Sequence, residues 1–99
     1  MITKWIQFRV AEDSASDFRA ELSKIESASR AEAGCVHYAA FQSTDTPALF
    51  TVLESWEGAE VFEAHRQSAH IAAFKERCAE MIEEKSGLSL EPLATEAAG

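Results

Sequence analysis

The stretch CVHYAAFQSTDTPALFTVLESW, residues 35–56, predicts two antiparallel strands joined by a short turn. Residues 35–43 alternate in character, which places Val36, Tyr38 and Ala40 on one face and His37, Ala39 and Phe41 on the other. Asp45 and Pro47 favour a turn, since proline cannot join a central ladder. Residues 49–56 alternate again, and one face carries Phe50, Val52, Glu54 and Trp56. Two such runs around a turn are typical of a β-hairpin.

The segment before this hairpin predicts a strand and then a helix. Residues 2–10 alternate, with Ile6, Phe8 and Val10 on one face and Trp5 on the other. Apolar residues then recur at helical spacing: Ala15, Phe18, Leu22, Ile25 and Ala28. We expect a helix over about 14–32, because Ser14 with Asp17 resembles a capping box and Gly34 suits the position after a helix end.

The segment after the hairpin predicts two short helices and a final strand. Gly58 opens a helical stretch over 59–66, and Ser68 can cap a second helix with an apolar stripe of Ile71, Phe74, Cys78 and Met81 or Ile82. We expect Gly87 to end that helix, which puts the acidic run on its solvated face: Glu80, Glu83 and Glu84. Residues 88–93 then form a brief last strand, with Pro92 near a sheet edge or end.

The predicted order β-α-β-β-α-β defines a ferredoxin-like α+β fold, a four-stranded antiparallel sheet with both helical segments on one face. We expect one domain over residues 1–94 and a C-terminal tail over 95–99. The helices cover only one side of the sheet, so the other side leaves an apolar patch in water: Trp5, Leu49, Leu53 and Phe41. Because such a patch usually marks an interaction surface, we expect a homodimer formed by sheet-to-sheet packing.

Composition excludes several classes of partner. The 99 residues carry 9 Lys and Arg against 17 Asp and Glu, a formal charge of −8, which disfavours nucleic acid and anionic membrane surfaces. No apolar run is long enough to span a membrane. Two cysteines, Cys35 and Cys78, are too few for a disulfide scaffold, and the N-terminus lacks a leader pattern. These features predict a cytoplasmic protein with reduced cysteines.

Glu54, His65 and His70 are the candidate catalytic residues. Glu54 shares a strand face with apolar residues, where a carboxylate is costly to bury without a partner. It fits either an acid/base group in an apolar pocket or a strand-end side chain turned to solvent or paired with arginine.

His65 and His70 flank the break between the two helical stretches. On one continuous helix they would lie about 140° apart, whereas a new helix starting at Ser68 would let the rings converge. Converging imidazoles could move protons near neutral pH; the alternative is that both are helix-end or surface residues. This spacing does not favour a metal site, and none is expected.

Six further side chains are candidates for lining a substrate pocket: Tyr38, Trp56, Phe8, Val52, Phe62 and Phe74. The Tyr38 hydroxyl could donate into a pocket or be satisfied within the core. Trp56 could form a wall against an aromatic substrate or serve in packing alone. His37 points the other way, toward the predicted dimer surface.

Three stretches together resemble the antibiotic biosynthesis monooxygenase (ABM) family of small dimeric α+β barrel proteins. They are SRAEAGCVHY at 29–38, FQS at 41–43 with LFTVLESWE at 49–57, and FEAHRQSAHIAAF at 62–74. Their order and spacing cover nearly the whole chain, and they are more specific to the family than to one reaction. The resemblance implies a ferredoxin-like subunit that dimerises through its sheet, with a pocket between sheet and helices.

This family includes cofactor-independent oxygenases of quinols and polyketide anthrones, haem-degrading enzymes and an isomerase of a quorum-signal phosphosugar. The chain is similar to the polyketide oxygenases at Trp56, but their Asn and Tyr partners fall at Val52 and Phe62 here. The exact polyketide mechanism therefore does not transfer.

The haem-degrading members use an Asn-Trp-His set, which falls near Ile6, His65 and Lys75 in this chain. None of the three positions matches, so haem breakdown is not expected. The chain most resembles the small bacterial quinol monooxygenase-like proteins, in which four positions recur in this motif form: Glu54, Trp56, His65 and His70.

The leading hypothesis is a cofactor-independent monooxygenase that oxidises a small electron-rich aromatic, such as a hydroquinone, with O₂. The sequence carries no flavin or metal motif, so no cofactor is expected and the substrate supplies the electrons. His65 or His70 would deprotonate the phenol, while Glu54 or Tyr38 would orient the ring or stabilise a developing peroxide.

Two alternatives remain. One is an isomerase of a small carbonyl compound acting by proton abstraction; a phosphorylated substrate would have Arg66 or Arg30 as its nearest cations. The other is a non-catalytic dimeric protein that binds an aromatic metabolite.

Overall fold

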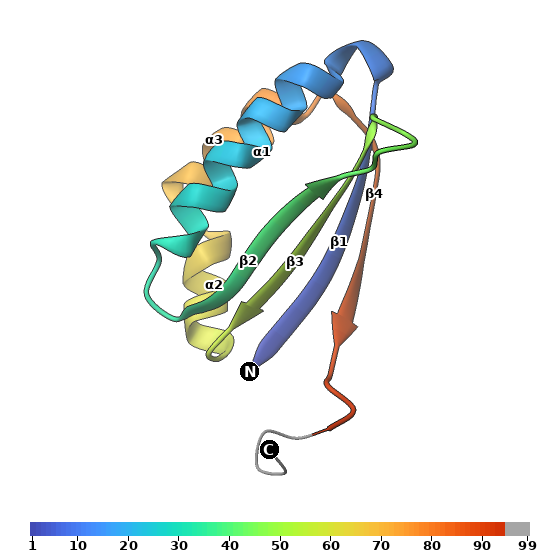
Figure 1. Ribbon diagram of the computed structural model, residues 1–99. Helices are drawn as coiled ribbons and strands as arrows, with labels where there is room; N and C mark the ends of the chain where they lie inside the picture. Colours follow the sequence, from blue (N-terminus) through green and yellow to red (C-terminus); the bar gives the residue numbers. More distant parts are fainter. Residues whose placement is uncertain (95–99) are drawn as a thin grey trace.

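A computed structural model describes residues 1–94, in which helices cover one face of a four-stranded antiparallel sheet (Figure 1). The elements are β1 (Ile2–Val10), the 3₁₀ turn η1 (Glu12–Ser14), α1 (Ala15–Arg30), β2 (Cys35–Gln42), β3 (Leu49–Trp56), α2 (Ala59–Arg66), α3 (Ala69–Cys78) and β4 (Ile82–Leu90). The strand order across the sheet is β2-β3-β1-β4. The predicted ferredoxin-like α+β fold is therefore confirmed, and the predicted tail, 95–99, lies outside the described residues.

Four phenylalanines from different elements form the centre of the core. Phe18 of α1 lies between the others, with ring centroids 5.3 Å from Phe8, 4.9 Å from Phe50 and 5.6 Å from Phe74. All four side chains are buried. Each such aromatic pair adds about 0.5–1.5 kcal/mol beyond the burial of its area. This cluster fixes α1 and α3 against β1 and β3.

The strand register defines a row of polar side chains on the helix-facing side of the sheet. Glu54 of β3 pairs with Tyr38 of β2 on one side and with Lys4 of β1 on the other, and Lys4 pairs in turn with Ser89 of β4. The buried residues of β3 alternate as predicted, so Glu54 faces the helices and not solvent. The fold thus places a carboxylate inside its own core.

The end of the second helical segment was predicted wrongly. The helix α3 stops at Cys78, and residues 82–90 form β4 instead of continuing the helix to Gly87. Local helical spacing is overridden because β1 has an unpaired edge, to which β4 binds from Thr3–Leu90 to Val10–Ile82. The acidic run is therefore not a helix face: Glu80 lies in a turn, and Glu83 and Glu84 are exposed on an edge strand.

The start of β2 also departs from simple alternation. Cys35 pairs with Trp56 and His37 with Ser55, so Val36 is the extra residue of a β-bulge. The prediction that Val36 shares the buried face of Tyr38 is wrong, since Val36 is 52% exposed.

The helix starts confirm one predicted cap and not the other. The Ser68 hydroxyl accepts a hydrogen bond from the backbone N–H of Ile71 at the start of α3. The Ser14 side chain precedes α1 but makes no such bond, and α1 ends at Arg30, two residues earlier than expected. The break between α2 and α3 at Ser68 is thus a capped helix start.

Gly34 fixes how the end of α1 meets α2. Its φ of +83° lies in the left-handed region, and a Cβ built there would approach Val61 of α2 to 2.7 Å. The Gly34 carbonyl also accepts a hydrogen bond from the Glu57 N–H just before α2. No larger residue fits this junction without strain.

Replacing Gly34 with alanine is expected to lower the free energy of unfolding by about 2–5 kcal/mol, from backbone strain plus overpacking against Val61. Urea denaturation followed by far-UV circular dichroism measures the loss. Gly58→Ser is the matched control, because Gly58 is extended and a Cβ there meets nothing within 4 Å. A Gly34→Ala midpoint equal to that of the control would contradict this account of the junction.

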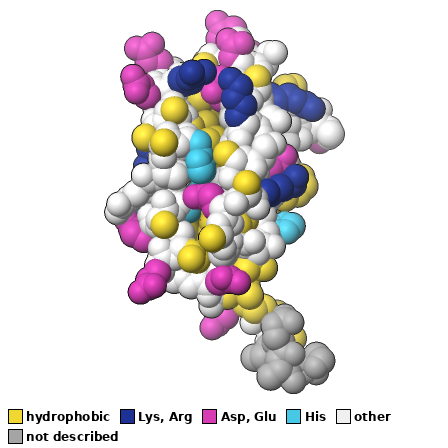
Figure 2. Space-filling view, turned by 90° about the vertical axis from the view of Figure 1, so that its left-hand side faces the viewer, with side chains coloured by type: hydrophobic (Ala, Val, Ile, Leu, Met, Phe, Trp, Pro, Cys, Tyr) yellow, Lys and Arg dark blue, Asp and Glu magenta, His cyan; other side chains and the backbone are white. Residues whose placement is uncertain are grey.

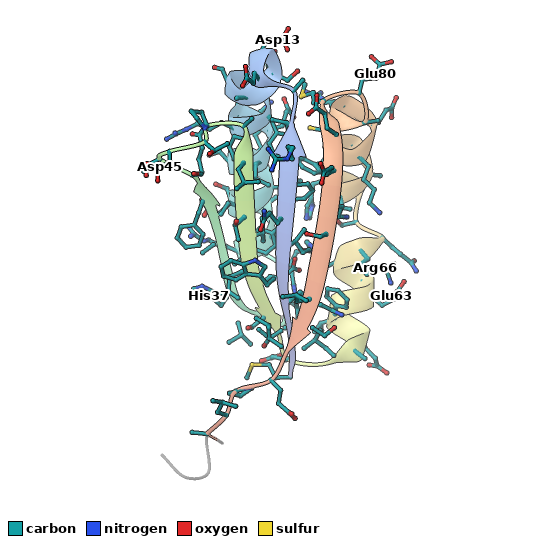
Figure 3. All side chains as sticks on the ribbon, turned by 90° about the vertical axis from the view of Figure 1, so that its right-hand side faces the viewer. Asp13, His37, Asp45, Glu63, Arg66 and Glu80 are labelled. Atoms are coloured by element: carbon teal, nitrogen blue, oxygen red, sulfur yellow. The ribbon has the colours of Figure 1, made fainter. Side chains whose placement is uncertain are left out.

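The sheet face opposite the helices carries exposed apolar side chains. Figure 3 views this face, with the helices behind the strands. By register, Leu53, Trp5 and Leu88 form a row across three strands, and Trp5 is 39% and Leu88 61% exposed. The predicted patch therefore exists, and the homodimer it implies stays a prediction. Within residues 1–94, no helix has the length and hydropathy needed to cross a membrane.

Candidate active site

Four elements bring titratable side chains together beneath the helices. Glu54 comes from β3, His65 from α2 and His70 from α3, while Glu32 follows the end of α1. The Gly34 turn carries Glu32 toward α2, and the capped break at Ser68 redirects α3 so that His70 turns back toward His65. The two histidine ring centroids lie 6.1 Å apart.

Glu54 is almost fully buried and has one defined donor. Its side chain is 2% exposed, and the Trp56 indole Nε1–H donates to Glu54 Oε1 over 2.7 Å. Burial raises the pKa of Glu54, and the Trp56 hydrogen bond and the positive potential of His65 oppose that rise. Glu54 therefore holds a proton more readily than a surface carboxylate does.

His65 lies between two carboxylates. Its Nδ1 is 2.6 Å from Glu32 Oε2, while its Nε2 is 3.7 Å from Glu54 Oε1, beyond a direct hydrogen bond. The Glu32 contact favours a proton on Nδ1, since a carboxylate only accepts. In that tautomer of the neutral ring, Nε2 carries the free lone pair.

His70 shares the carboxylate that holds His65. Its Nε2 lies 3.3 Å from Glu32 Oε2, but the geometry makes no hydrogen bond, and the atom is buried without another partner among the described residues. The side chains of His70 and Glu32 are 29% and 20% exposed. On the helical side of the molecule, a histidine reaches the surface beside an acidic side chain, with hydrophobic groups around them (Figure 2).

Three of the six expected lining residues surround His65. The Trp56 ring lies 4.3 Å from the His65 ring, Tyr38 5.8 Å and Phe62 6.4 Å, measured between centroids. Burial raises the pKa of the Tyr38 hydroxyl, and the Glu54 charge adds to this, so Tyr38 stays a donor. The imidazole thus lies in an aromatic surrounding.

The other three expected lining residues belong to the core. Phe8 and Phe74 pack in the phenylalanine cluster described above, and Val52 is buried beside it. The structure does not bring Phe8 or Phe74 to the histidines. Phe8 and Val52 lie on the sheet face that α1 covers, and Phe74 of α3 packs into the same cluster, so these side chains fill the core.

Glu32 is the residue that sequence reasoning missed. It lies within the stretch SRAEAGCVHY, but nothing in that stretch distinguishes it from a solvated residue at the end of a helix. One usable signal was its position two residues before a helix-ending glycine, where the chain turns back toward the core. Cys35 lies close by, and burial and the charges of Glu32 and Glu54 raise the pKa of its thiol, which disfavours the thiolate form.

Glu32, His65 and His70 also form the one donor set in residues 1–94 with the composition of a metal site. One ligand atom from each lies within 4.8 Å of the others. Two imidazoles and a carboxylate suit divalent transition metals. However, ligands of a tetrahedral zinc ion would stand about 3.3 Å apart, whereas His65 Nδ1 and Glu32 Oε2 are 2.6 Å apart. The observed spacing is that of a hydrogen bond, so a metal would have to displace it.

A surface hollow lies between α1 and β2, away from the histidine cluster. It has a volume of about 650 Å³ and is lined by Arg19, Ser23, Glu26 and Gln42 among others. Arg19 donates to Gln42 there, and none of the histidine cluster borders this hollow. The candidate site is therefore defined by its buried proton-exchanging groups.

Removing the Glu54 charge is expected to stabilise the protein increasingly as pH rises. The pKa of Glu54 is higher in the folded chain than in the unfolded chain. Its contribution to the free energy of unfolding is therefore full below the ordinary carboxyl pKa and is lost as pH rises through the pKa of the folded chain. Glu54→Gln should therefore match the wild type near about pH 4 and exceed it in Tm at neutral pH.

Thermal melts at a series of pH values test this prediction. The control Glu80→Gln changes an exposed turn residue, labelled in Figure 3, and its curve should follow the wild type. A Glu54→Gln variant less stable than wild type at neutral pH would mean that the buried charge stabilises the fold through His65 and Trp56.

The chain is a small ferredoxin-like α+β protein in which a buried histidine lies between two carboxylates and among aromatic rings. The family model for antibiotic biosynthesis monooxygenase (ABM) matches residues 1–77, from β1 to nearly the end of α3. The chain therefore belongs to the ABM family.

Solved structures share the fold of this chain. The PA3566 protein of Pseudomonas aeruginosa superposes with a TM-score of 0.89 at 27% identity, over 94% of this chain and 94% of that one. Rv0793 of Mycobacterium tuberculosis gives 0.86 at 24% identity, over 96% and 97%. A Nitrosomonas europaea protein gives 0.89 at 22% identity, over 95% and 100%. No curated protein matches the sequence.

Proposed function

We propose that this ABM-family protein is a cofactor-independent monooxygenase that oxidises a small electron-rich aromatic of the hydroquinone class with O₂. The observation that carries the proposal is the state of His65. This imidazole is buried against Trp56, with Nδ1 held by Glu32 and Nε2 free to accept a proton. Such an arrangement is that of an oriented general base.

The first step is removal of a phenol proton. His65 Nε2 takes it, and the Glu32 carboxylate beside Nδ1 stabilises the resulting imidazolium, while Glu54, whose burial favours its protonated form, faces Nε2. His65 Nε2 and Glu54 Oε1 are 3.7 Å apart, so one phenol oxygen could form a triangle with these two atoms and lie within hydrogen-bond distance of both. The phenolate gives up an electron far more readily than the phenol does.

Oxygen then reacts with the phenolate itself. One electron passes from the phenolate to O₂, and the two radicals combine to form a C–O bond and a ring-bound peroxide. The O–O bond breaks as the ring carbon loses its hydrogen as a proton, so water leaves and a carbonyl remains. In sum, hydroquinone plus O₂ gives hydroxyquinone plus water, with one oxygen atom in each product.

Aromatic side chains suit the binding of such a ring. Trp56 and Phe62 lie 6.4 Å apart and flank His65, and the half-buried Phe62 borders the solvent. Movement of Phe62 would admit a planar substrate next to Nε2. Tyr38, kept protonated, and Glu54 in its protonated form would donate hydrogen bonds to the peroxide oxygen.

The test is oxygen uptake by metal-free, flavin-free protein with a panel of hydroquinones. We expect uptake with no release of oxygen on adding catalase, and one ¹⁸O atom from ¹⁸O₂ in the quinone. Uptake equal to a protein-free control across the panel would overturn the proposal. Turnover that persists without oxygen would favour the isomerase alternative, and binding without turnover would favour a binding protein.

A further inference from the structure

Among the described residues, three of the four lysines form no ion pair, although the chain has 17 acidic residues. Within residues 1–94, Lys4, Lys75 and Lys85 form no ion pair, whereas Lys24 pairs with Glu21. The arginines that the sequence offered for a phosphate are both engaged. Arg66 pairs with Glu63, and Arg30 pairs with Glu26 and donates to the Tyr38 carbonyl. Within residues 1–94, the cationic side chains without an ion pair are therefore these three lysines and Arg19, and Arg19 donates to Gln42 at the hollow between α1 and β2.

Lys4 and Lys85 lie on the helix-facing side of the sheet, close to the site. Lys4 is the register neighbour of Glu54, and its Nζ lies 5.7 Å from the Phe62 ring and 2.7 Å from the Ser89 hydroxyl. Lys85 is opposite Phe8, with Nζ 5.7 Å from that ring. Burial and the charge of Lys75 lower the pKa of Lys85. Both ammonium groups thus lie over aromatic rings, and the charge of buried Glu54 acts on both without forming an ion pair with either.

Between these lysines, the helices leave β4 uncovered. Lys85, Gly87 and Ser89 alternate on the helix-facing side, and all three are exposed; we refer to them as the β4 strip. A Cβ on Gly87 would meet nothing nearer than 3.8 Å, and its cross-strand neighbour Ile6 is apolar and half-buried. The strip therefore offers open space beside an apolar surface, with a lysine at each end.

We propose that the β4 strip, with Lys4 at its edge, binds an anionic oxygen group, a carboxylate or phosphate, carried by the substrate's aromatic ring. The placement of the ring beside Phe62 and His65 rests on the function proposed above. Lys4 links the two regions, because its ammonium group lies over the Phe62 ring and its backbone neighbours Glu54 in the sheet. An anion over Gly87 would find two ammonium donors and no competing carboxylate on the strip.

Binding is measured without oxygen, so that turnover plays no part. Isothermal titration compares 4-hydroxybenzoate, its uncharged methyl ester and phenyl phosphate on the full chain. Wild type should bind the carboxylate more tightly than the ester, and Lys4→Gln or Lys85→Gln should each weaken its binding about fivefold, the scale of a partly exposed ion pair. Lys24→Gln on α1 is the matched control and should change nothing.

A second variant tests whether binding needs the open space over Gly87 as well as the lysine charges. Gly87→Val fills the strip without altering any charge and should weaken both charged ligands. If the ester binds as well as the carboxylate, or if both lysine variants bind like wild type, the strip is no anion site. Tighter binding of phenyl phosphate than of hydroxybenzoate would assign the strip to phosphate, and the reverse order to carboxylate. If the protein prefers the charged ligands but takes up no oxygen, the oxygenase proposal is wrong and the anion site stands.

Discussion

Replacing His65 with glutamine is expected to lower kcat for hydroquinone-dependent oxygen uptake by about 10²–10⁴-fold, the range for loss of a general base. Glutamine keeps a polar side chain in this buried position but cannot accept the phenol proton. An oxygen electrode measures the rate, and a melting curve confirms that the variant is folded. His37→Gln is the matched control, because His37 lies on the opposite sheet face and is exposed.

Two neighbouring variants separate the roles within the cluster. Glu32→Gln should reduce kcat by about 10–100-fold, the usual cost of losing the group that orients a histidine, with little change in KM. His70→Gln should cost less than His65→Gln, since its Nε2 lacks a hydrogen bond to Glu32. If His70→Gln abolishes uptake and His65→Gln does not, His70 is the base and the assignment made above is wrong.

The position of Glu54 was predictable from the sequence because β3 obeys a strict period of two. Phe50, Val52 and Trp56 define the buried face, so the carboxylate had to share it. The same rule failed where the backbone breaks the period, at the Val36 bulge. Alternation predicts a facing direction only while each residue has one partner across the ladder.

The contacts of His65 were predictable only in part. The capped break at Ser68 could be read from residue types, and it brings His70 back toward His65. The contact between Glu32 and His65 could not be predicted, because it depends on the left-handed turn at Gly34 and on Val61 packing against that turn. Contacts that arise from the angle between two helices leave no periodic trace in either helix.

The last strand was predicted over 88–93, and its start at Ile82 was missed for a different reason. Residues 79–87 combine good helix formers with an apolar spacing that continues α3, and only the open edge of β1 decides their structure. Lys85, Gly87 and Ser89 then acquire a helix-facing position that no local pattern indicates. The lysines that we assign to anion binding therefore became visible only with the sheet order.

Replacing Trp5 with glutamate is expected to convert a dimer into a monomer, raising the dissociation constant by about 10²–10⁴-fold. Trp5 lies at the centre of the open face, between Leu53 and Leu88 in register. In a two-fold interface each substitution occurs twice, and burying an unpaired charge costs several kcal/mol at each copy. A tenfold change in affinity corresponds to about 1.4 kcal/mol.

Light scattering coupled to gel filtration, over a range of protein concentrations, measures this change. The wild type should elute as a dimer and Trp5→Glu as a folded monomer. The control Arg19→Glu alters an exposed side chain on α1, on the opposite side of the molecule, and should leave the dimer intact. A wild type that stays monomeric at high concentration, or a dimeric Trp5→Glu, would rule out sheet-to-sheet packing.

The same variant tests whether assembly supports catalysis. Trp5 points away from the helices, whereas its chain neighbours Lys4 and Ile6 point toward them, so the substitution does not touch the histidine cluster directly. Leu88 likewise lies on the open face, while Gly87 and Ser89 lie on the other. A loss of oxygen uptake in a folded, monomeric Trp5→Glu would therefore arise from loss of the dimer, acting on the site through β1 and β4, the two strands that carry both the apolar face and the lysines of the β4 strip.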